Sequence, residues 1–158
     1  MSEEAYNATM NMTTMYGTFL NTVAQEIGLE QALDLMSKSV EALGASMGKT
    51  TKEQMGIKDL DVETASSIMK GMGATYGITA EIEEGPNTVL VKNYKCPFYD
   101  GLKMAGFDHE AIEVFCRNGP ATMVNAFVGQ LDPTAKYQLR KFRSSQDDSC
   151  EEEIVLKK

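Results

Sequence analysis

The spacing of apolar residues changes along the chain and divides it into helical and extended segments. Over residues 9–27, apolar side chains recur at intervals of three and four, as on one face of a helix, and Gly28 follows as a stop signal. Residues 29–48 and 61–76 repeat this pattern, and Gly77 ends the third segment. The first half of the chain is therefore predicted to form three helices.

A strict alternation of apolar and polar residues begins after the third helix. Residues 78–83 and 88–94 alternate in this way on either side of the turn formed by residues 85–87, which indicates a β-hairpin. Pairing Ile82 with Val89 places the apolar side chains of both strands on one face. That face is expected to lie against the helices.

The rest of the chain predicts short helices followed by a second hairpin. The helical segments are residues 98–105, 108–117 and 120–130, and the strands are residues 135–143 and 150–156. The predicted fold is a single α+β domain over residues 1–158, with N-terminal helices, a β-hairpin, short helices and a second β-hairpin. Its one antiparallel four-stranded sheet is packed on the helices. Centring the last turn on Asp147 predicts that Arg143 pairs with Glu151 and Lys141 with Glu153.

Composition narrows the class of protein. A net charge of −8 argues against a nucleic-acid partner, which needs a basic surface. No apolar run approaches the roughly 20 residues that span a bilayer, and the acidic start lacks the pattern of a secretory signal, so no membrane contact and a cytoplasmic location are expected. Eleven methionines fit a core, an adaptable pocket or an interface. Tyr6, Met10 and Met12 extend the apolar character of the first helix beyond one stripe, which predicts a homodimer.

Three cysteines in the second half of the chain are the strongest candidates for chemistry. Cys96 precedes Pro97 at an expected helix start, where the helix dipole and free N–H groups would lower the pKa of its thiol. Cys116 shares a helix face with apolar residues and fits a buried inert thiol equally well, whereas Cys150 opens a strand. The only histidine, His109, lies in the first turn of a helix and is more typical of a surface residue than of a base.

The three thiols also raise the question of a metal site. They are separated by 19 and 33 residues and lack a Cys-x-x-Cys knuckle, but ligands can converge from distant segments. A site formed by Cys96, Cys116 and Cys150 for an iron–sulfur cluster or zinc therefore stays open. Whether Cys150 approaches Cys96 depends on strand order, which the sequence does not decide.

Four short segments resemble one known family. They are residues 96–103 (CPFYDGLK), 115–116 (FC), 131–133 (LDP) and 147–151 (DDSCE). Together they are similar to the motifs of the L-2-amino-thiazoline-4-carboxylic acid hydrolase-like family. The order of elements is also similar to that of four-vinyl-reductase-type ligand-binding domains and of trafficking-particle subunits.

The resemblance implies a hydrolase that opens a cyclic, amidine-like C–N bond, other than a peptide bond, in a small sulfur-containing ring. Cys96 would then act as nucleophile or metal ligand, with Cys116 and Cys150 completing a thiol cluster. Asp100 would orient a proton or a substrate amine, and His109 would be the base available near neutral pH. The alternatives are a small-molecule-binding or metal- and redox-sensing module with a three-cysteine site and no turnover, and a structural dimerisation module.

Overall fold

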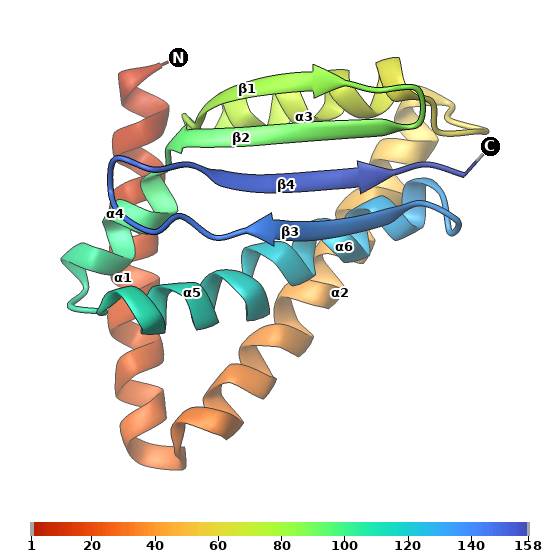
Figure 1. Ribbon diagram of the computed structural model, residues 1–158. Helices are drawn as coiled ribbons and strands as arrows, with labels where there is room; N and C mark the ends of the chain where they lie inside the picture. The colour runs from red at the N-terminus through yellow and green to blue at the C-terminus, as the bar shows by residue number, and fades with distance from the viewer. Residues whose placement is uncertain (1, 158) are drawn as a thin grey trace.

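The computed structural model describes residues 2–157, which form six helices and four strands (Figure 1). In chain order they are α1 (Glu3–Ile27), α2 (Leu29–Met55), α3 (Val62–Tyr76), β1 (Thr79–Glu84), β2 (Thr88–Lys95), α4 (Pro97–Met104), α5 (His109–Asn118), α6 (Pro120–Leu131), β3 (Lys136–Lys141) and β4 (Cys150–Val155). The α+β order expected from the sequence is confirmed.

The strands form one antiparallel sheet in the order β1-β2-β4-β3, so the last strand of the chain lies in the middle. Helices α3 and α6 pack against one face of this sheet, α2 packs behind α6, and α1 packs against α4 (Figure 1). The other face carries exposed ion pairs, among them Lys92 with Glu83 and Arg140 with Glu153. One face of the sheet is thus available to enclose a site.

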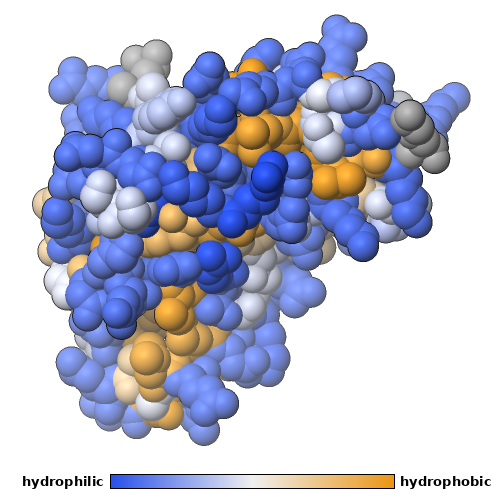
Figure 2. Space-filling model, viewed as in Figure 1, coloured by the Kyte–Doolittle hydropathy of each residue, from blue (hydrophilic) through white to orange (hydrophobic). Residues whose placement is uncertain are grey.

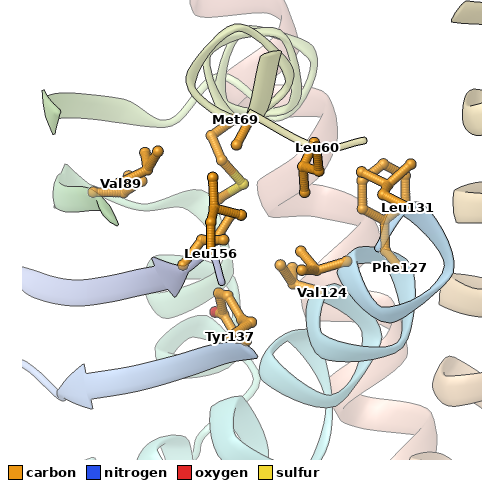
Figure 3. Close-up of a cluster of buried hydrophobic side chains, with 12 residues drawn as sticks. Leu60, Met69, Val89, Val124, Phe127, Leu131, Tyr137 and Leu156 are labelled. Carbon is orange, nitrogen blue, oxygen red and sulfur yellow. The ribbon is translucent and has the colours of Figure 1, made fainter. Parts of the chain in front are cut away.

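A hydrophobic core lies between the sheet, α3 and α6. Figure 3 shows Met69 of α3 and Tyr137 of β3 reaching into this layer from opposite sides, with Leu156 between them. Val89 of β2 is fully buried and Val91 is 3% exposed, and both contribute to the same core. The apolar face predicted for the first hairpin therefore does lie against the helices, because alternate residues of a strand share one face.

Two predicted helix boundaries were wrong. Helix α1 begins at Glu3, capped by the Ser2 side chain, and α2 continues to Met55 instead of ending near Gly48. Gly48 lies within α2, where a Cβ atom would collide with the carbonyl oxygen of Phe127 on α6. This glycine allows two helix backbones to approach closely, so it did not mark a helix end.

The registers of both hairpins differ from the sequence prediction. Ile82 pairs with Val91 instead of Val89, a shift of two residues that keeps the same face inward. In the second hairpin Glu153 lies opposite Gln138 instead of Lys141, and an irregularity follows between Leu139 and Lys141. Arg140 pairs with Glu153 at 3.1 Å and Lys141 with Asp148 at 2.7 Å, which contradicts the predicted Arg143–Glu151 and Lys141–Glu153 pairs.

Apolar surface remains outside the core. No helix within residues 2–157 is long and apolar enough to cross a membrane. Hydrophobic side chains are nevertheless exposed below the sheet, toward the end of the molecule where α1 and α2 meet (Figure 2). From that connection the two long helices diverge like the arms of a V (Figure 1).

Candidate functional site

A cavity of about 90 Å³ lies beneath the inner face of the sheet, between the strands and the helices α3, α4 and α6. All three cysteines line it, together with Asn93, Tyr137, Glu152 and mainly apolar side chains. Because one water molecule occupies about 30 Å³ in the liquid, the cavity has room for roughly three waters or a small ring. Its mainly apolar wall with a few polar groups is typical of a small-molecule site, and its volume restricts the bound group to a small one.

Glu152 places a carboxyl group in the wall of this cavity. It lies on β4 between Cys150 and Ile154 in the alternating pattern, and it pairs with Val91 of β2 and Leu139 of β3. A carboxylate in the middle of an apolar sheet face is costly unless it is hydrogen-bonded or protonated.

The surroundings of Glu152 make its charge sensitive to pH. Burial raises the pKa of Glu152 to about 7, while hydrogen bonding with Tyr137 and Asn93 lowers it by less. The Asn93 Nδ2 atom donates to Oε1 at 2.8 Å. A carboxyl group with this pKa can both accept and donate a proton near neutral pH, which is the property required of a general acid–base catalyst.

Strand order brings Cys150 close to Cys96, the question that the sequence left open. Strand β4 pairs with β2 so that Cys150 is opposite Asn93, three residues before Cys96. Cys116 reaches the same cavity from α5. All three thiols are free and partly buried.

The expectation of an activated Cys96 thiolate was wrong. Cys96 is the N-cap residue of α4, as predicted, but it makes no side-chain capping hydrogen bond. Burial raises the pKa of the Cys96 thiol to about 11, and the backbone N–H groups of Tyr99 and Phe98 offset only part of this effect. Burial also raises the pKa of Cys116 well above its usual value. Loss of hydration therefore outweighs the helix dipole at Cys96.

The metal prediction gains no support from the geometry. Among residues 2–157, no group of three or more histidine, cysteine or acidic side chains is placed so that it could hold a metal ion. Cys96, Cys116 and Cys150 line one cavity but do not form such a group.

Asp100 and His109 lie away from the cavity wall. Asp100 accepts a hydrogen bond from the Tyr6 hydroxyl, and the Lys95 ammonium stands 4.1 Å from the centre of the Tyr6 ring. The His109 Nδ1 atom is 3.3 Å from the Tyr99 hydroxyl. Neither of these proposed catalytic residues lines the space that Cys96 faces.

Arg143 supports the end of the cavity where β2 meets α4. It is 2% exposed, and its Nη2 atom donates to the carbonyl oxygens of Asn93 at 2.9 Å and Tyr94 at 3.1 Å. The guanidinium also lies beside Cys150 and over the Tyr99 ring. Arg143 thus fixes the strand end from which Asn93 and Cys96 reach the cavity.

Sequence reasoning missed Glu152, Asn93, Tyr137 and Arg143. A signal existed for the first two, because Glu152 alternates with Cys150 and Ile154 and Asn93 alternates with Val91. A period of two places these polar residues on the inner face. Nothing comparable marks Arg143, which lies in the connection after β3.

A second, larger space adjoins the cavity. It is an apolar groove of about 650 Å³ between α1, α2 and the ends of α3, α4, α5 and α6. Four residues line both spaces, namely Tyr76, Phe98, Pro120 and Met123. The Tyr76 and Phe98 rings pack edge to face, with 5.4 Å between their centres.

Comparison with known proteins agrees with the fold and identifies a family. A crystal structure of a trafficking protein particle complex subunit 3 from Naegleria fowleri, covalently bound to palmitic acid, is 13% identical, with a TM-score of 0.65 over 96% of each chain. It has the same fold. No curated protein matches the chain.

The family model for L-2-amino-thiazoline-4-carboxylic acid hydrolase matches residues 8–138. The match includes the N-terminal helices as well as Cys96 and Cys116, and it ends before β4. We conclude that the chain belongs to the L-2-amino-thiazoline-4-carboxylic acid hydrolase family.

Proposed function

We propose that this protein hydrolyses a small cyclic, sulfur-containing amidine in the cavity beneath the sheet, with Glu152 as the general acid and base. The observation that carries the proposal is the Glu152 carboxyl group, which has a pKa of about 7 and lies in an otherwise mainly apolar cavity wall. The family name supplies the substrate class, a five-membered ring with nitrogen and sulfur on one carbon.

The carboxyl group suits both binding and reaction. When it is ionised, it is the counter-ion that an amidinium group requires in an apolar environment. Asn93 holds its Oε1 atom, which leaves Oε2 for the interaction with Tyr137 or with substrate. A carboxylate fixed in this way is directed toward the ring without reorganisation.

The reaction consumes one water molecule. Glu152 accepts a proton from water as the oxygen attacks the carbon that bears both heteroatoms. The protonated carboxyl returns this proton to the ring nitrogen, which already carries a proton in the amidinium cation, as the C–N bond breaks. The hydroxyl of the intermediate becomes the carbonyl oxygen, and its proton passes to the released amine. The product carries a free amine and a carbamoyl group on sulfur, and Glu152 is again ionised.

The thiols have a different role in this proposal from the one expected from the sequence. Because the pKa values of Cys96 and Cys116 are raised, both are protonated near neutral pH and are poor nucleophiles. In this proposal the two thiols fill part of the cavity wall and place polarisable sulfur atoms around the substrate sulfur.

The test is hydrolysis of L-2-amino-thiazoline-4-carboxylic acid by the purified protein, followed as new primary amine and confirmed by product mass. The Glu152→Gln variant should lose activity by about 10²-fold to 10⁴-fold, the usual contribution of a positioned acid or base. Glu151→Gln, one residue away on the opposite face of β4, should retain it. Equal activity of Glu152→Gln and the wild type would refute the assignment.

Binding without turnover is the second candidate function. It is favoured by the cavity lining, in which Glu152 is the one carboxyl group from the described part of the chain and can bind an amidinium without a second acid or base. Calorimetry with the same compound distinguishes the two candidates. Binding that depends on Glu152, with no amine formed, would identify a binding module.

A further inference from the structure

The cavity and the apolar groove are separated by a partition one residue thick. Tyr76, Phe98, Pro120 and Met123 each contribute to the walls of both spaces. They come from the end of α3 and the starts of α4 and α6, and each is only partly buried. The Met123, Phe98 and Tyr76 side chains therefore shape both spaces at once.

The two spaces have opposite chemical character. The cavity holds a carboxyl group, an amide and three thiols in about 90 Å³. The groove is about 650 Å³, and no charged side chain of the described chain lines it. Its walls are methionine, aromatic and aliphatic residues with Thr13 and Ser39 as minor polar contributors. Met15 at 70% exposure and Phe19 at 62% stand at its open side.

From this arrangement we propose that the groove is a second subsite, which holds an apolar substituent attached to the ligand whose polar head enters the cavity. The ligand class is an amphiphilic amidine, with a small cationic head and an aliphatic or aromatic tail. The assignment of the head rests on the proposed function, whereas the assignment of the tail rests on the groove and the shared partition.

A tail explains the position of the groove better than a second copy of the chain does. A partner protein would cover the exposed side chains of α1 and α2, such as Met15, Phe19 and Leu43. The binding of a partner protein would not explain why the groove ends at the four residues that also line the cavity. A ligand with both a head and a tail requires this continuity.

The experiment measures the affinity of a homologous series of probes by calorimetry at pH 8, where most Glu152 is ionised. The series is acetamidine, butanamidine and hexanamidine, with hexan-1-ol as a probe that has a tail and no charged head. Burial of each methylene should strengthen binding roughly fourfold. Because burial of two methylenes already gives more than about tenfold, hexanamidine should bind at least about tenfold more tightly than acetamidine.

Two matched lysine variants locate the tail. Met15→Lys introduces a charge at the open side of the groove, and it should weaken hexanamidine at least about fivefold while leaving acetamidine unchanged. Met104→Lys changes a similarly exposed methionine on α4 that lines neither space, and it should leave both affinities unchanged. Glu152→Gln should weaken every amidine and leave hexan-1-ol unaffected.

Each other outcome overturns one of the two assignments. If acetamidine binds through Glu152 but longer chains gain nothing, the groove subsite is wrong and the proposed function stands. If hexan-1-ol binds as tightly as hexanamidine and Glu152→Gln changes neither, the groove is unconnected to the cavity. If sedimentation shows a dimer that Met15→Lys dissociates, and chain length has no effect, a second copy occupies the groove. If no amidine binding depends on Glu152, the proposed function is wrong.

Discussion

The carboxyl group of Glu152 is more easily protonated in the folded protein than in the unfolded chain, and replacing Glu152 by glutamine removes this titrating group. Burial raises the pKa of this carboxyl from 4.5 to about 7. Between these values the folded protein binds more protons than the unfolded chain, so its free energy of unfolding falls as the pH rises. The contribution is fully favourable below pH 4.5 and is lost by the time the pH exceeds 7. This is the reverse of the behaviour of an acidic group in a salt bridge.

The size of the effect follows from the shift. A difference of about 2.5 pH units corresponds to about 3 kcal/mol, an upper value because water in the cavity would solvate the carboxylate. For a chain of this length, 1 kcal/mol changes the melting temperature by about 2–4 °C. Raising the pH from 5 to 8 should therefore lower the melting temperature of the wild type by several degrees through this group alone.

Thermal unfolding of the wild type, Glu152→Gln and Glu151→Gln between pH 5 and 8 tests this reasoning. Glu152→Gln should unfold at nearly constant temperature across the range and should be more stable than the wild type at pH 8. Glu151→Gln, on the opposite face of the same strand, should follow the wild type. Aspartates with lowered pKa values, such as Asp148, affect stability only at lower pH. A pH slope in Glu152→Gln equal to that of the wild type would refute the argument.

Three further predictions follow from buried or closely packed groups. At pH 7, Cys96 should react with iodoacetamide roughly 100-fold more slowly in the folded protein than in urea, because burial raises its pKa to about 11. Burial also raises the pKa of Cys116, which should likewise react more slowly when folded. Mass spectrometry measures both rates, and similar rates in the two conditions would contradict this. Gly44→Ala should cost more than about 2 kcal/mol in chemical unfolding, since its Cβ would meet the Met123 carbonyl of α6, whereas Gly71→Ala on open α3 should gain up to about 1 kcal/mol. Equal effects of these two substitutions would argue against the close contact of α2 and α6. Tyr6→Phe should cost about 1 kcal/mol through loss of its hydrogen bond to Asp100, and the exposed Tyr94→Phe should cost less; the reverse order would count against the buried contact.

The order and type of the elements could be predicted because local signals agree with the final packing. Gly77 ends α3 in a left-handed conformation, and Asp108 caps α5 by accepting a hydrogen bond from Ala111 N. Gly48 misled the prediction because its role depends on Phe127, which is distant in sequence. The register of the first hairpin was wrong because a shift of two residues leaves its apolar pattern unchanged, so the pattern does not decide between the two pairings. The second hairpin contains an irregularity between Leu139 and Lys141, which the alternating pattern does not reveal.

The candidate site was predicted only in part. The cysteines were found because their residue type is rare in the chain and chemically distinctive. Their protonation state was wrong, because a local argument from the α4 dipole does not include burial against the core formed by α1, α2, α4 and α5. Glu152 was missed between Glu151 and Glu153 although it alternates with Cys150 and Ile154, and the strand pairing shows that it alone of the three faces inward. The dimer predicted from the N-terminal helices stays a prediction.

The central position of β4 has a consequence for how the protein is made. Asn93 and Glu152, which meet in the cavity, are separated by 59 positions along the chain. Synthesis proceeds from the N-terminus, so β2 and β3 exist before the strand that must insert between them. Until β4 arrives, both have an unpaired edge and the space beneath them is open to solvent. Contacts between distant segments form slowly, and exposed strand edges favour association with other chains. The carboxyl group that completes the site is thus delivered by the same strand that closes the sheet, and a chain that ends before residue 150 has neither.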